Sequence, residues 1–373
     1  MKIGIDISQI AHKGTGVARF TNGFIESILK HNSENEWTFF YSSFRAKIDQ
    51  SLKQKIENSQ HKLHTFPFPP SLLSFVFNDL HKYSKLVTCN LKLFTDLDWF
   101  ITSDWIEFPL PIKKATIIHD LVVEKHPETV HPRIIRTHKK RLKYASRESK
   151  ILFADSQATS NDLQEKYGIE KKRIIINYPG VEISPAQSKA NQKAYLIKHG
   201  ITEPYILTVG KREPRKNLQR LIKAFQNLKP HGKSPQLIIV GPEGWGKIDE
   251  VQNNNIRFLG YVSDEVLSTL YTNACCFVYP SIYEGFGFPI IEAMKYGCPV
   301  ATSNVSSLPE IAGKAALFFD PFDVSSIQNA IEQLLQIPKL RFDLVTKGFD
   351  QSKKYTWDRY YNTLINAFEK YSS

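Results

Sequence analysis

Short apolar segments alternate along the chain with amphipathic ones, and this alternation predicts the fold. The apolar segments are rich in Ile, Val and Phe and end in turn residues, as the buried strands of a parallel sheet do. In the first half they occupy residues 2–7, 37–42, 115–123, 150–156 and 173–181, and in the second half residues 204–210, 235–241, 255–262 and 275–281.

Amphipathic segments with helical spacing lie between these predicted strands, at residues 19–31, 159–168, 217–228 and 263–274. In the second of them, Thr159 or Ser160 suits the N-cap and Gly168 the helix end. Repeated strand–helix–strand order implies parallel sheets covered by helices. Because a polar stretch at 184–204 separates two such blocks, we expect an α/β protein with two doubly wound, Rossmann-like domains facing a central cleft.

Composition and charge narrow the class of protein. The 373 residues are 42% hydrophobic and 23% charged, which excludes disordered, collagen-like and coiled-coil chains. There is no apolar run long enough to span a bilayer, and the N-terminal residues lack the features of a signal peptide. The four cysteines form no C-x-x-C pair, which disfavours zinc and disulfide frameworks and fits a reducing cytosol. The net charge of +12 is spread along the chain and favours an anionic partner.

The segment YPSIYEGFGFPIIEAMKYGCPV, residues 279–300, carries two glutamates around a glycine-containing turn. Glu284 lies in the predicted loop and Glu292 in the early turns of the following helix, so both carboxylates can face the opening of the same binding site. Gly285 and Gly287 let backbone N–H groups approach a ligand, and a helix N-terminus favours a phosphate. The alternative is an ordinary turn with a carboxylate near a helix dipole.

Three further loops that follow predicted strands carry candidate chemistry, and the first of them contains a basic cluster. In residues 206–225, four cations crowd one loop and would repel one another unless an anion such as a diphosphate lay between them; they are Lys211, Arg212, Arg215 and Lys216. After the first strand, Gly14 and Gly16 permit a tight turn. After the strand at 115–118, His119 and Asp120 could contact a sugar hydroxyl or move a proton. The alternative for the four cations is a solvated basic loop, and the alternative for His119 and Asp120 is a polar pair that ends a strand.

The whole chain resembles the family-4 retaining glycosyltransferases of the GT-B fold, most closely the mannosyltransferases of bacterial surface-polysaccharide assembly. The paired glutamates around Gly-Phe-Gly-Phe-Pro carry this resemblance. It implies an acceptor-binding domain at 1–185, a nucleotide-sugar-binding domain at 186–354, and a C-terminal helix at 355–373 that packs back on the first domain.

The resemblance also implies roles for single residues. Glu292 binds the ribose, Glu284 approaches the transferred sugar as a candidate catalytic residue, and Gly285, Phe286 and Gly287 lie against the sugar and phosphates. Lys216 and Arg212 stabilise the departing diphosphate, with Lys211 as the alternative to Arg212. His119 and Asp120 lie near the donor sugar, and the loop of Gly14 and Gly16 faces the diphosphate. No metal or other cofactor is expected, and Asp96-Leu97-Asp98, which looks like a metal motif, is predicted to be a turn or a strand end.

Residues 133–150 contain eight Lys or Arg and one Glu. At helical spacing Arg133, Arg136, Lys140, Lys143 and Arg147 share one face, with Ile135, Leu142 and Ala145 roughly opposite. A solvated helix with a buried stripe is one interpretation. The other is an interfacial helix on anionic lipid, supported by the aliphatic and aromatic residues of segment 72–77.

The sequence therefore predicts a metal-independent, retaining hexosyltransferase that works in the cytoplasm, with peripheral contact at the inner face of the cytoplasmic membrane. The expected donor is GDP-mannose, and the expected acceptor is a glycan or a polyprenyl-diphosphate-linked saccharide. A GT-B nucleotide-sugar epimerase is the alternative enzyme. A nucleic-acid-binding protein suits the charge but not its scatter, and the G-x-G-x-x-G fingerprint of a dinucleotide-dependent oxidoreductase is absent from residues 14–19.

Overall fold

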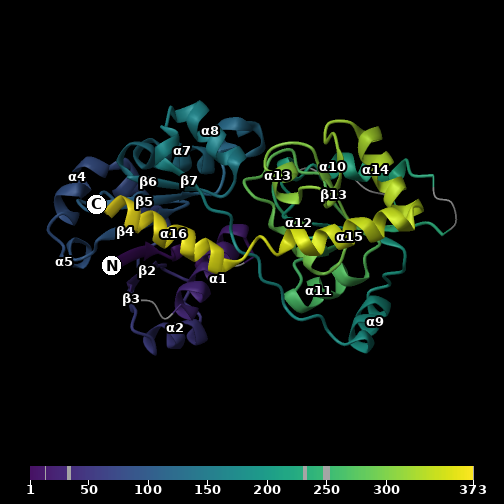
Figure 1. The fold of residues 1–373 in the computed structure, drawn as a ribbon, viewed down its shortest axis with the longest axis horizontal. Coiled ribbons are helices and arrows are strands. Elements are labelled where there is room, and N and C mark those ends of the chain that lie inside the picture. Colours follow the sequence, from purple (N-terminus) through teal and green to yellow (C-terminus); the bar gives the residue numbers. More distant parts are fainter. Residues whose placement is uncertain (13, 32–34, 230–232, 247–252, 373) are drawn as a thin grey trace. The chain divides into compact units, whose positions relative to one another are not determined.

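The structure is a computed structural model that describes residues 1–12, 14–31, 35–229, 233–246 and 253–372. The chain divides into two compact units (Figure 1). Unit 1 comprises Met1–Pro127, His131–Gly180 and Trp357–Ser373, and unit 2 comprises Glu128–Val130 and Val181–Thr356.

In unit 1 the described residues form a seven-stranded parallel sheet of order β3-β2-β1-β4-β5-β6-β7. The order reverses direction between β1 and β4, which makes their carboxyl ends the topological switch point. The strands are β1 Lys2–Asp6, β2 Glu36–Ser42, β3 Lys62–Phe66, β4 Trp99–Ser103, β5 Lys113–Ile118, β6 Ile151–Ala154 and β7 Ile174–Ile176.

The helices of unit 1 connect these strands. They are α1 Gly16–Lys30, α2 Gln50–Glu57, α3 Pro70–Ser74, α4 His81–Thr88, α5 Lys92–Thr95, α6 Val122–Lys125, α7 Pro132–Glu148, α8 Gln157–Tyr167 and α16 Trp357–Ser372, with a π-helical turn η2 at Phe75–Asp79 and short 3-10 turns η1 Ser8–Ala11 and η4 Lys171–Arg173. A further 3-10 turn, η3, covers Pro127–Thr129.

The C-terminal helix α16 belongs to unit 1 although the preceding helix, α15, belongs to unit 2. Its first residue, Trp357, packs so closely on Gly23 and Gly180 that a Cβ on either glycine would overlap it. Further along, Phe368 stacks on Trp99 of β4 with ring centroids 4.5 Å apart. The expected return of the C-terminal helix to the first half of the chain is therefore confirmed.

Unit 2 contains a six-stranded parallel sheet of order β10-β9-β8-β11-β12-β13 among the described residues. Its switch point lies between β8 and β11. The strands are β8 Tyr205–Val209, β9 Gln236–Val240, β10 Ile256–Gly260, β11 Cys276–Tyr279, β12 Val300–Ser303 and β13 Ala316–Phe319, and the helices are α9 Lys189–Lys198, α10 Leu218–Gln226, α11 Asp264–Asn273, α12 Phe288–Lys295, α13 Leu308–Ala312, α14 Val324–Gln336 and α15 Pro338–Ser352, with a 3-10 turn η5 at Pro214–Lys216.

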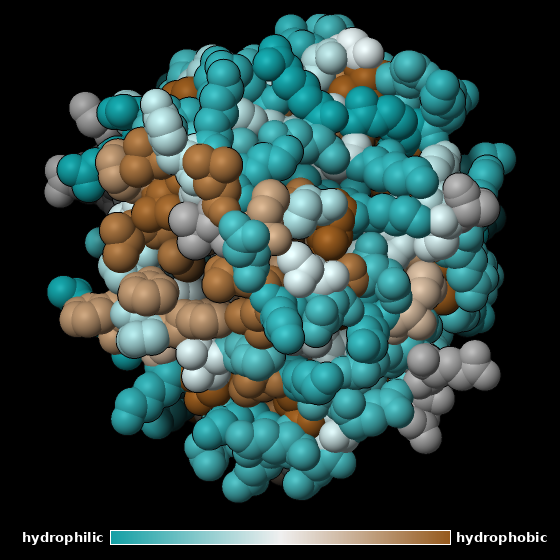
Figure 2. All heavy atoms as spheres, turned by 90° about the vertical axis from the view of Figure 1, so that its left-hand side faces the viewer, coloured by the Kyte–Doolittle hydropathy of each residue, from teal (hydrophilic) through white to brown (hydrophobic). Residues whose placement is uncertain are grey.

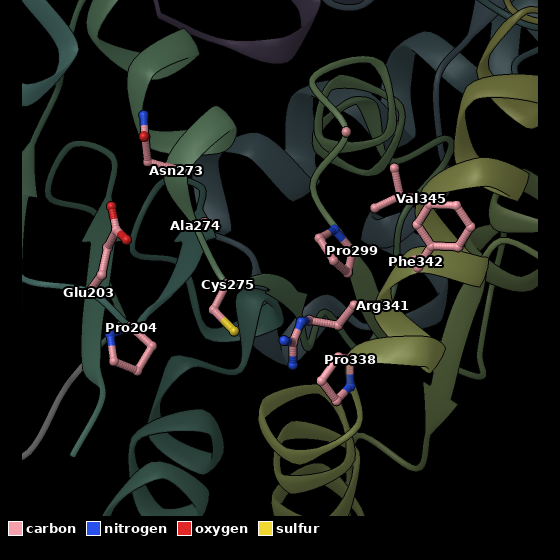
Figure 3. Close-up of a pocket in the computed structure, with 11 residues that line it drawn as sticks. Glu203, Pro204, Asn273, Ala274, Cys275, Pro299, Pro338, Arg341, Phe342 and Val345 are labelled. Atoms are coloured by element: carbon pink, nitrogen blue, oxygen red, sulfur yellow. The ribbon is translucent and has the colours of Figure 1, made fainter. Parts of the chain in front are cut away.

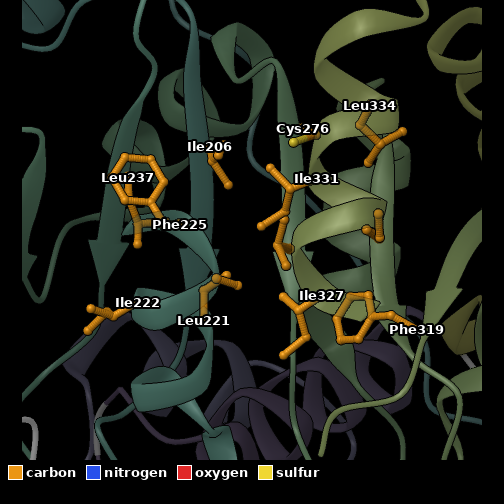
Figure 4. Packing of buried hydrophobic residues seen from close by; sticks show 14 of the residues in the cluster. Ile206, Leu221, Ile222, Phe225, Leu237, Cys276, Phe319, Ile327, Ile331 and Leu334 are labelled. Atoms are coloured by element: carbon orange, nitrogen blue, oxygen red, sulfur yellow. The ribbon is translucent and has the colours of Figure 1, made fainter. Parts of the chain in front are cut away.

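The core of unit 2 shows how this sheet is covered (Figure 4). Leu221 and Phe225 of α10 and Ile327 and Ile331 of α14 meet the side chains of the central strands in one buried cluster. Burial of such apolar surface contributes roughly 25 cal/mol per Å², so these two helices fix the sheet and, with it, the loops at its carboxyl edge.

The predicted α/β class with two doubly wound units is confirmed. The predicted N-cap of the helix after β6 is wrong: Ser156, not Thr159 or Ser160, caps α8, and its side chain accepts a hydrogen bond from the Thr159 N–H. Asp96 and Asp98 lie in the turn between α5 and β4, as predicted. Within the described ranges, no helix combines the length and the apolar character that crossing a bilayer requires.

Candidate active site

In unit 2 the predicted site residues gather at the carboxyl ends of β8 and β11, the two strands at the switch point. The chain leaves β8, makes the 3-10 turn η5 that ends at Lys216, and enters α10. It leaves β11 at Tyr279 and reaches Glu284 in the loop before α12. Parallel neighbours end at the same edge of a sheet, so residues far apart in sequence meet here.

The Glu284 carboxylate is held by two cations and a phenol. Its Oε1 accepts from Lys216 Nζ at 2.5 Å and from the Tyr279 hydroxyl at 2.9 Å, and its Oε2 accepts from Arg215 Nη1 at 2.7 Å. The side chain is only 9% exposed. Burial alone would raise the pKa of Glu284, but the charges of Arg215 and Lys216 outweigh it and lower the pKa to about 2.

Lys216 is equally enclosed. Its ammonium group also donates to the Tyr279 hydroxyl at 2.7 Å, and burial together with the charge of Arg215 lowers its pKa. Arg215 Nε also donates to Glu213 Oε2 at 3.1 Å, and the Glu213 side chain is only 12% exposed, so these two cations and two carboxylates balance one another in a largely desolvated place. An anion could share the two cations with the carboxylates, because charge-assisted hydrogen bonds are strong where water is excluded.

The two remaining cations of this loop point elsewhere. Arg212 Nη2 pairs with Glu243 Oε1 at 2.8 Å, and its guanidinium lies 5.4 Å from the Phe258 ring. Lys211 lies over the Trp245 ring at 4.8 Å. The structure thus joins Lys216 to Glu284 but joins neither Arg212 nor Lys211 to them, and it brings in Arg215, which the sequence showed only as one of four basic residues.

The loop of Gly285, Phe286 and Gly287 is fixed from a later loop. Ser306 and Ser307 donate to the Glu284 carbonyl at 2.6 and 2.8 Å. Gly287 has φ +97°, and a Cβ there would lie 2.9 Å from Leu308 Cδ2, so a glycine is required. The Phe286 side chain is buried against Tyr355, with ring centroids 5.3 Å apart.

Glu292 lies in the second turn of α12 and is 2% exposed. Its Oε2 accepts from the Tyr271 hydroxyl at 3.2 Å. The two glutamates thus stand on the same loop–helix segment, one at its start and one within the helix. The two serines and Tyr279 were not predicted as site residues; only the place of the serines in the loop after β12 and that of Tyr279 at the end of β11 could have indicated them.

In unit 1 the corresponding edge carries His119. Its Nδ1 lies 2.8 Å from Asp155 Oδ2, and its Nε2 lies 3.1 Å from Ser103 Oγ. A carboxylate only accepts, so Nδ1 donates, and in the neutral ring Nε2 accepts from the hydroxyl. Burial alone would lower the pKa of His119, but the charge and hydrogen bond of Asp155 raise it. Asp155, like His119, directly follows an apolar strand, and that position was the signal that sequence reasoning passed over.

The other predicted residues of unit 1 have conformational roles in the structure. Gly14 adopts φ +80°, and Gly16 is the first residue of α1, whose N-cap Thr15 accepts from the Ala18 N–H. Asp120 Oδ1 accepts from the Val122 N–H at 2.9 Å at the start of α6. Lys13, which directly precedes Gly14, lies outside the described residues.

A pocket of about 640 Å³ in unit 2 lies away from this chemistry (Figure 3). Its lining includes Pro204, Cys275 and Pro299, which precede β8, β11 and β12, together with Arg341 and Phe342 of α15. These positions mark the amino ends of the strands, whereas Glu284 and Lys216 stand at the carboxyl ends. In the part of the chain that the structure describes, no three His, Cys, Asp or Glu side chains group as metal ligands would.

Comparison with known proteins gives the family of the chain. Residues 191–351 match the family described as glycosyl transferases group 1. The chain is 31% identical to the O-antigen chain mannosyltransferase B of Escherichia coli, over 99% of this chain and all of that one. It is 28% identical to the O-antigen chain mannosyltransferase RfbU of Salmonella typhimurium, over 67% of each chain.

Among solved structures, the sucrose-phosphate synthase of Thermosynechococcus elongatus matches with a TM-score of 0.73 over 99% of this chain and 98% of that one, at 18% identity. At that identity the likeness concerns the fold. The near full-length match to a curated relative carries the family assignment: this chain belongs to the glycosyl transferases group 1.

Proposed function

We propose that the protein transfers a mannosyl residue from GDP-mannose to a growing surface polysaccharide and retains the anomeric configuration. The observation that carries this proposal is the 31% identity, over nearly the whole chain, to a protein named O-antigen chain mannosyltransferase B. Retention follows from the resemblance of residues 279–300 to the signature of the retaining family.

In this reaction Lys216 and Arg215 bind the diphosphate of the donor and stabilise it as it leaves. The support is their burial and their fixed geometry on Glu284. Preorganised cations stabilise developing negative charge without a reorganisation cost at the moment of reaction. Two such cations take the part that a metal ion plays in other transferases, so we propose a metal-independent reaction, which chelation with EDTA should leave undiminished.

In this proposal Glu284 positions the two cations. The family resemblance also implies that it lies near the transferred sugar. Its carboxylate holds both cations before the donor arrives, and a diphosphate then shares them. Glu292 accepts the ribose hydroxyls, and His119 in unit 1, oriented by Asp155, contacts the transferred sugar. The placement of Arg212 on Glu243 favours Arg215 as the diphosphate ligand.

The acceptor that we propose is a saccharide on a polyprenyl diphosphate lipid, reached by an enzyme that rests on the inner face of the cytoplasmic membrane. The net charge of +12 supports attraction to both the diphosphate and anionic lipid. The cytoplasmic location itself stays a prediction.

A panel of nucleotide sugars in a thermal-shift assay tests the donor. A ligand at about 100 times its Kd stabilises the native state by ~2.7 kcal/mol, so GDP-mannose should raise Tm more than UDP-glucose or GDP alone. Turnover with and without an acceptor then separates the activities, because an epimerase would release free sugar without one. Selective stabilisation by a UDP-sugar would refute the donor, and an inverted linkage in the product would refute retention.

A further inference from the structure

Helix α4 buries three polar side chains and exposes two large apolar ones. His81, Ser84 and Thr88 are buried, whereas Tyr83 is 74% exposed and Leu86 72% exposed. Surface helices of globular proteins normally show the opposite pattern. An outward apolar face on a charged protein indicates a surface that meets a partner.

Polar contacts beneath the helix fix this orientation. His81 Nδ1 lies 2.6 Å from the Phe77 carbonyl, and its Nε2 lies 2.9 Å from Glu148 Oε1. The His81 ring also stacks on Tyr144 of α7 with centroids 3.7 Å apart. At the other end of α4, the Thr88 hydroxyl donates to the Pro109 carbonyl at 2.5 Å. A rotation of α4 that buried Leu86 would break all of these contacts.

The exposed apolar side chains continue onto the two preceding elements, η2, which packs with α4, and α3, which packs with η2. We call the resulting surface the apolar face; it consists of Leu72, Phe75, Leu80, Tyr83 and Leu86, which are 39–74% exposed. All the large exposed hydrophobic side chains described in unit 1 fall within residues 44–91. Figure 2, which looks onto the end of unit 1 where α4 and α5 lie, shows apolar side chains gathered on one part of that surface.

Two of the residues expected from the sequence to join this surface do not. Leu73 and Phe77 pack against the buried cluster around Phe94 and Phe100. They anchor the apolar face to the core of unit 1, while Leu72 and Phe75 point outward.

Cations border the apolar face on two sides. On α4 itself, Lys82 and Lys85 are exposed next to Tyr83 and Leu86. On the neighbouring α7, Lys140 pairs with Asp79 of η2. This ion pair places the face of α7 that carries Lys140 beside the apolar face. The same face of α7 carries a basic row that, at spacings of three and four residues, contains Arg136, Lys143 and Arg147, all exposed.

We propose that the apolar face, with the basic row of α7 beside it, docks on an anionic lipid bilayer. Apolar side chains that enter the interface and cations that meet acidic headgroups together give reversible binding that neither gives alone. Each cation close to an anionic leaflet strengthens binding about fivefold. A second copy of the chain suits the surface less well, because a two-fold contact would bring the same lysines against one another.

This inference rests on the proposed function in one respect only: a lipid-linked acceptor would give the enzyme a reason to dock on a membrane. Its test contains no nucleotide sugar and no acceptor, so it fails or succeeds independently of the enzymatic activity. The full-length protein is mixed with sucrose-loaded vesicles of phosphatidylcholine, with or without phosphatidylglycerol, and the bound fraction is measured after sedimentation at low and high salt.

We expect the protein to bind the vesicles that contain phosphatidylglycerol and to leave them as salt rises. The double variant Tyr83→Ser/Leu86→Ser should bind roughly tenfold more weakly or worse, since each apolar side chain withdrawn from the interface weakens partitioning. Lys82→Glu/Lys85→Glu should lose binding to a similar degree. These four side chains are exposed, so unchanged circular dichroism and Tm are expected for both variants.

The matched control is Ile197→Ser/Phe342→Ser, which removes two side chains of unit 2 that are 67% and 72% exposed. It should bind like the unaltered protein. Equal binding to both kinds of vesicle, or equal weakening by the control, would overturn the proposal. The proposal would also be overturned if the protein bound no vesicles and instead formed a dimer in sedimentation velocity, and if Tyr83→Ser/Leu86→Ser abolished that dimer.

Discussion

Replacing Glu284 by Gln removes a negative charge that pairs with two largely enclosed cations, Arg215 and Lys216. The amide keeps the shape of the side chain but carries no charge, and its nitrogen cannot accept a hydrogen bond from Arg215 or Lys216. Both cations stay in place, because the 3-10 turn η5 determines their position, and Arg215 keeps a second carboxylate partner in Glu213, whereas Lys216 loses the carboxylate that it contacts. Breaking a buried ion pair by removing one partner is costly, since a desolvated charge is left without compensation.

The pKa of Glu284 gives the size of the effect. Its native value of about 2, against an ordinary value of 4.5, means that the folded protein binds the ionised form more strongly. At ~1.4 kcal/mol per pKa unit, the ionised carboxylate contributes ~3 kcal/mol to stability at pH 7. Because the native pKa is lowered, this stability is fully present above pH 4.5 and is lost as the pH falls toward 2; at about pH 3, more than half of it is gone.

The measurement must report on unit 2 itself, since two units need not unfold together. Hydrogen exchange followed by mass spectrometry, at increasing urea, gives the free energy of opening for peptides that contain β8 and β11. Glu243→Gln is the matched control, because Glu243 is 86% exposed and pairs with Arg212 in the same region. We expect the control to lose ~1 kcal/mol or less and Glu284→Gln to lose ~3 kcal/mol at pH 7.

The reasoning is refuted if Glu284→Gln costs no more than the control at pH 7. A loss of equal size at pH 7 and at pH 3 would also refute it, because the effect would then come from packing and not from charge.

Three other substitutions test the remaining parts of the site. Glu292→Ala should weaken nucleotide-sugar binding roughly tenfold or more in calorimetric titration, because the hydroxyl acceptor is gone; unchanged affinity would exclude the ribose role. Asp155→Asn should lower the pKa of His119, since the Asp155 charge raises it, and an NMR titration midpoint that stays in place would contradict this. Gly287→Ala should cost ~1–3 kcal/mol in urea unfolding because of its positive φ, whereas Gly16→Ala, where a Cβ meets nothing within 4 Å, should cost much less.

Much of the fold could be predicted from the sequence because parallel strands are buried on both faces. The segments that became β1, β8 and β9 are continuous apolar runs, and each ends where the structure ends the strand or within a few residues of it. Among the described strands, four escaped prediction: β4, with sequence WFITS, and β13, with sequence ALFF, have this apolar pattern and were nevertheless missed, whereas the other two lack it. Strand β3, with sequence KLHTF, lies at the sheet edge and is only partly buried, and β12, with sequence VATS, is short and half polar.

The site could be predicted only in part, for a similar reason. Sequence spacing shows which loops follow strands, and it directed attention to Glu284, Lys216 and His119. It does not show which way a side chain leaves a 3-10 turn, so four adjacent cations could not be sorted, and Arg212 was preferred where the structure joins Arg215 to Glu284. Nor does spacing reveal partners from another loop, such as Ser306, which donates to the Glu284 carbonyl.

The two units solve one electrostatic problem in the same way. In unit 2 a buried lysine that follows β8 meets a carboxylate that follows β11, and in unit 1 a largely buried histidine that follows β5 meets a carboxylate that follows β6. In each case the strands are hydrogen-bonded neighbours. A charged group at the end of an apolar strand is costly to bury alone, but the parallel topology brings the next strand's end beside it and allows an opposite charge to compensate. The loops that follow adjacent strands are therefore where this fold can keep reactive groups both desolvated and in place, and the proposed chemistry uses those loops in both units.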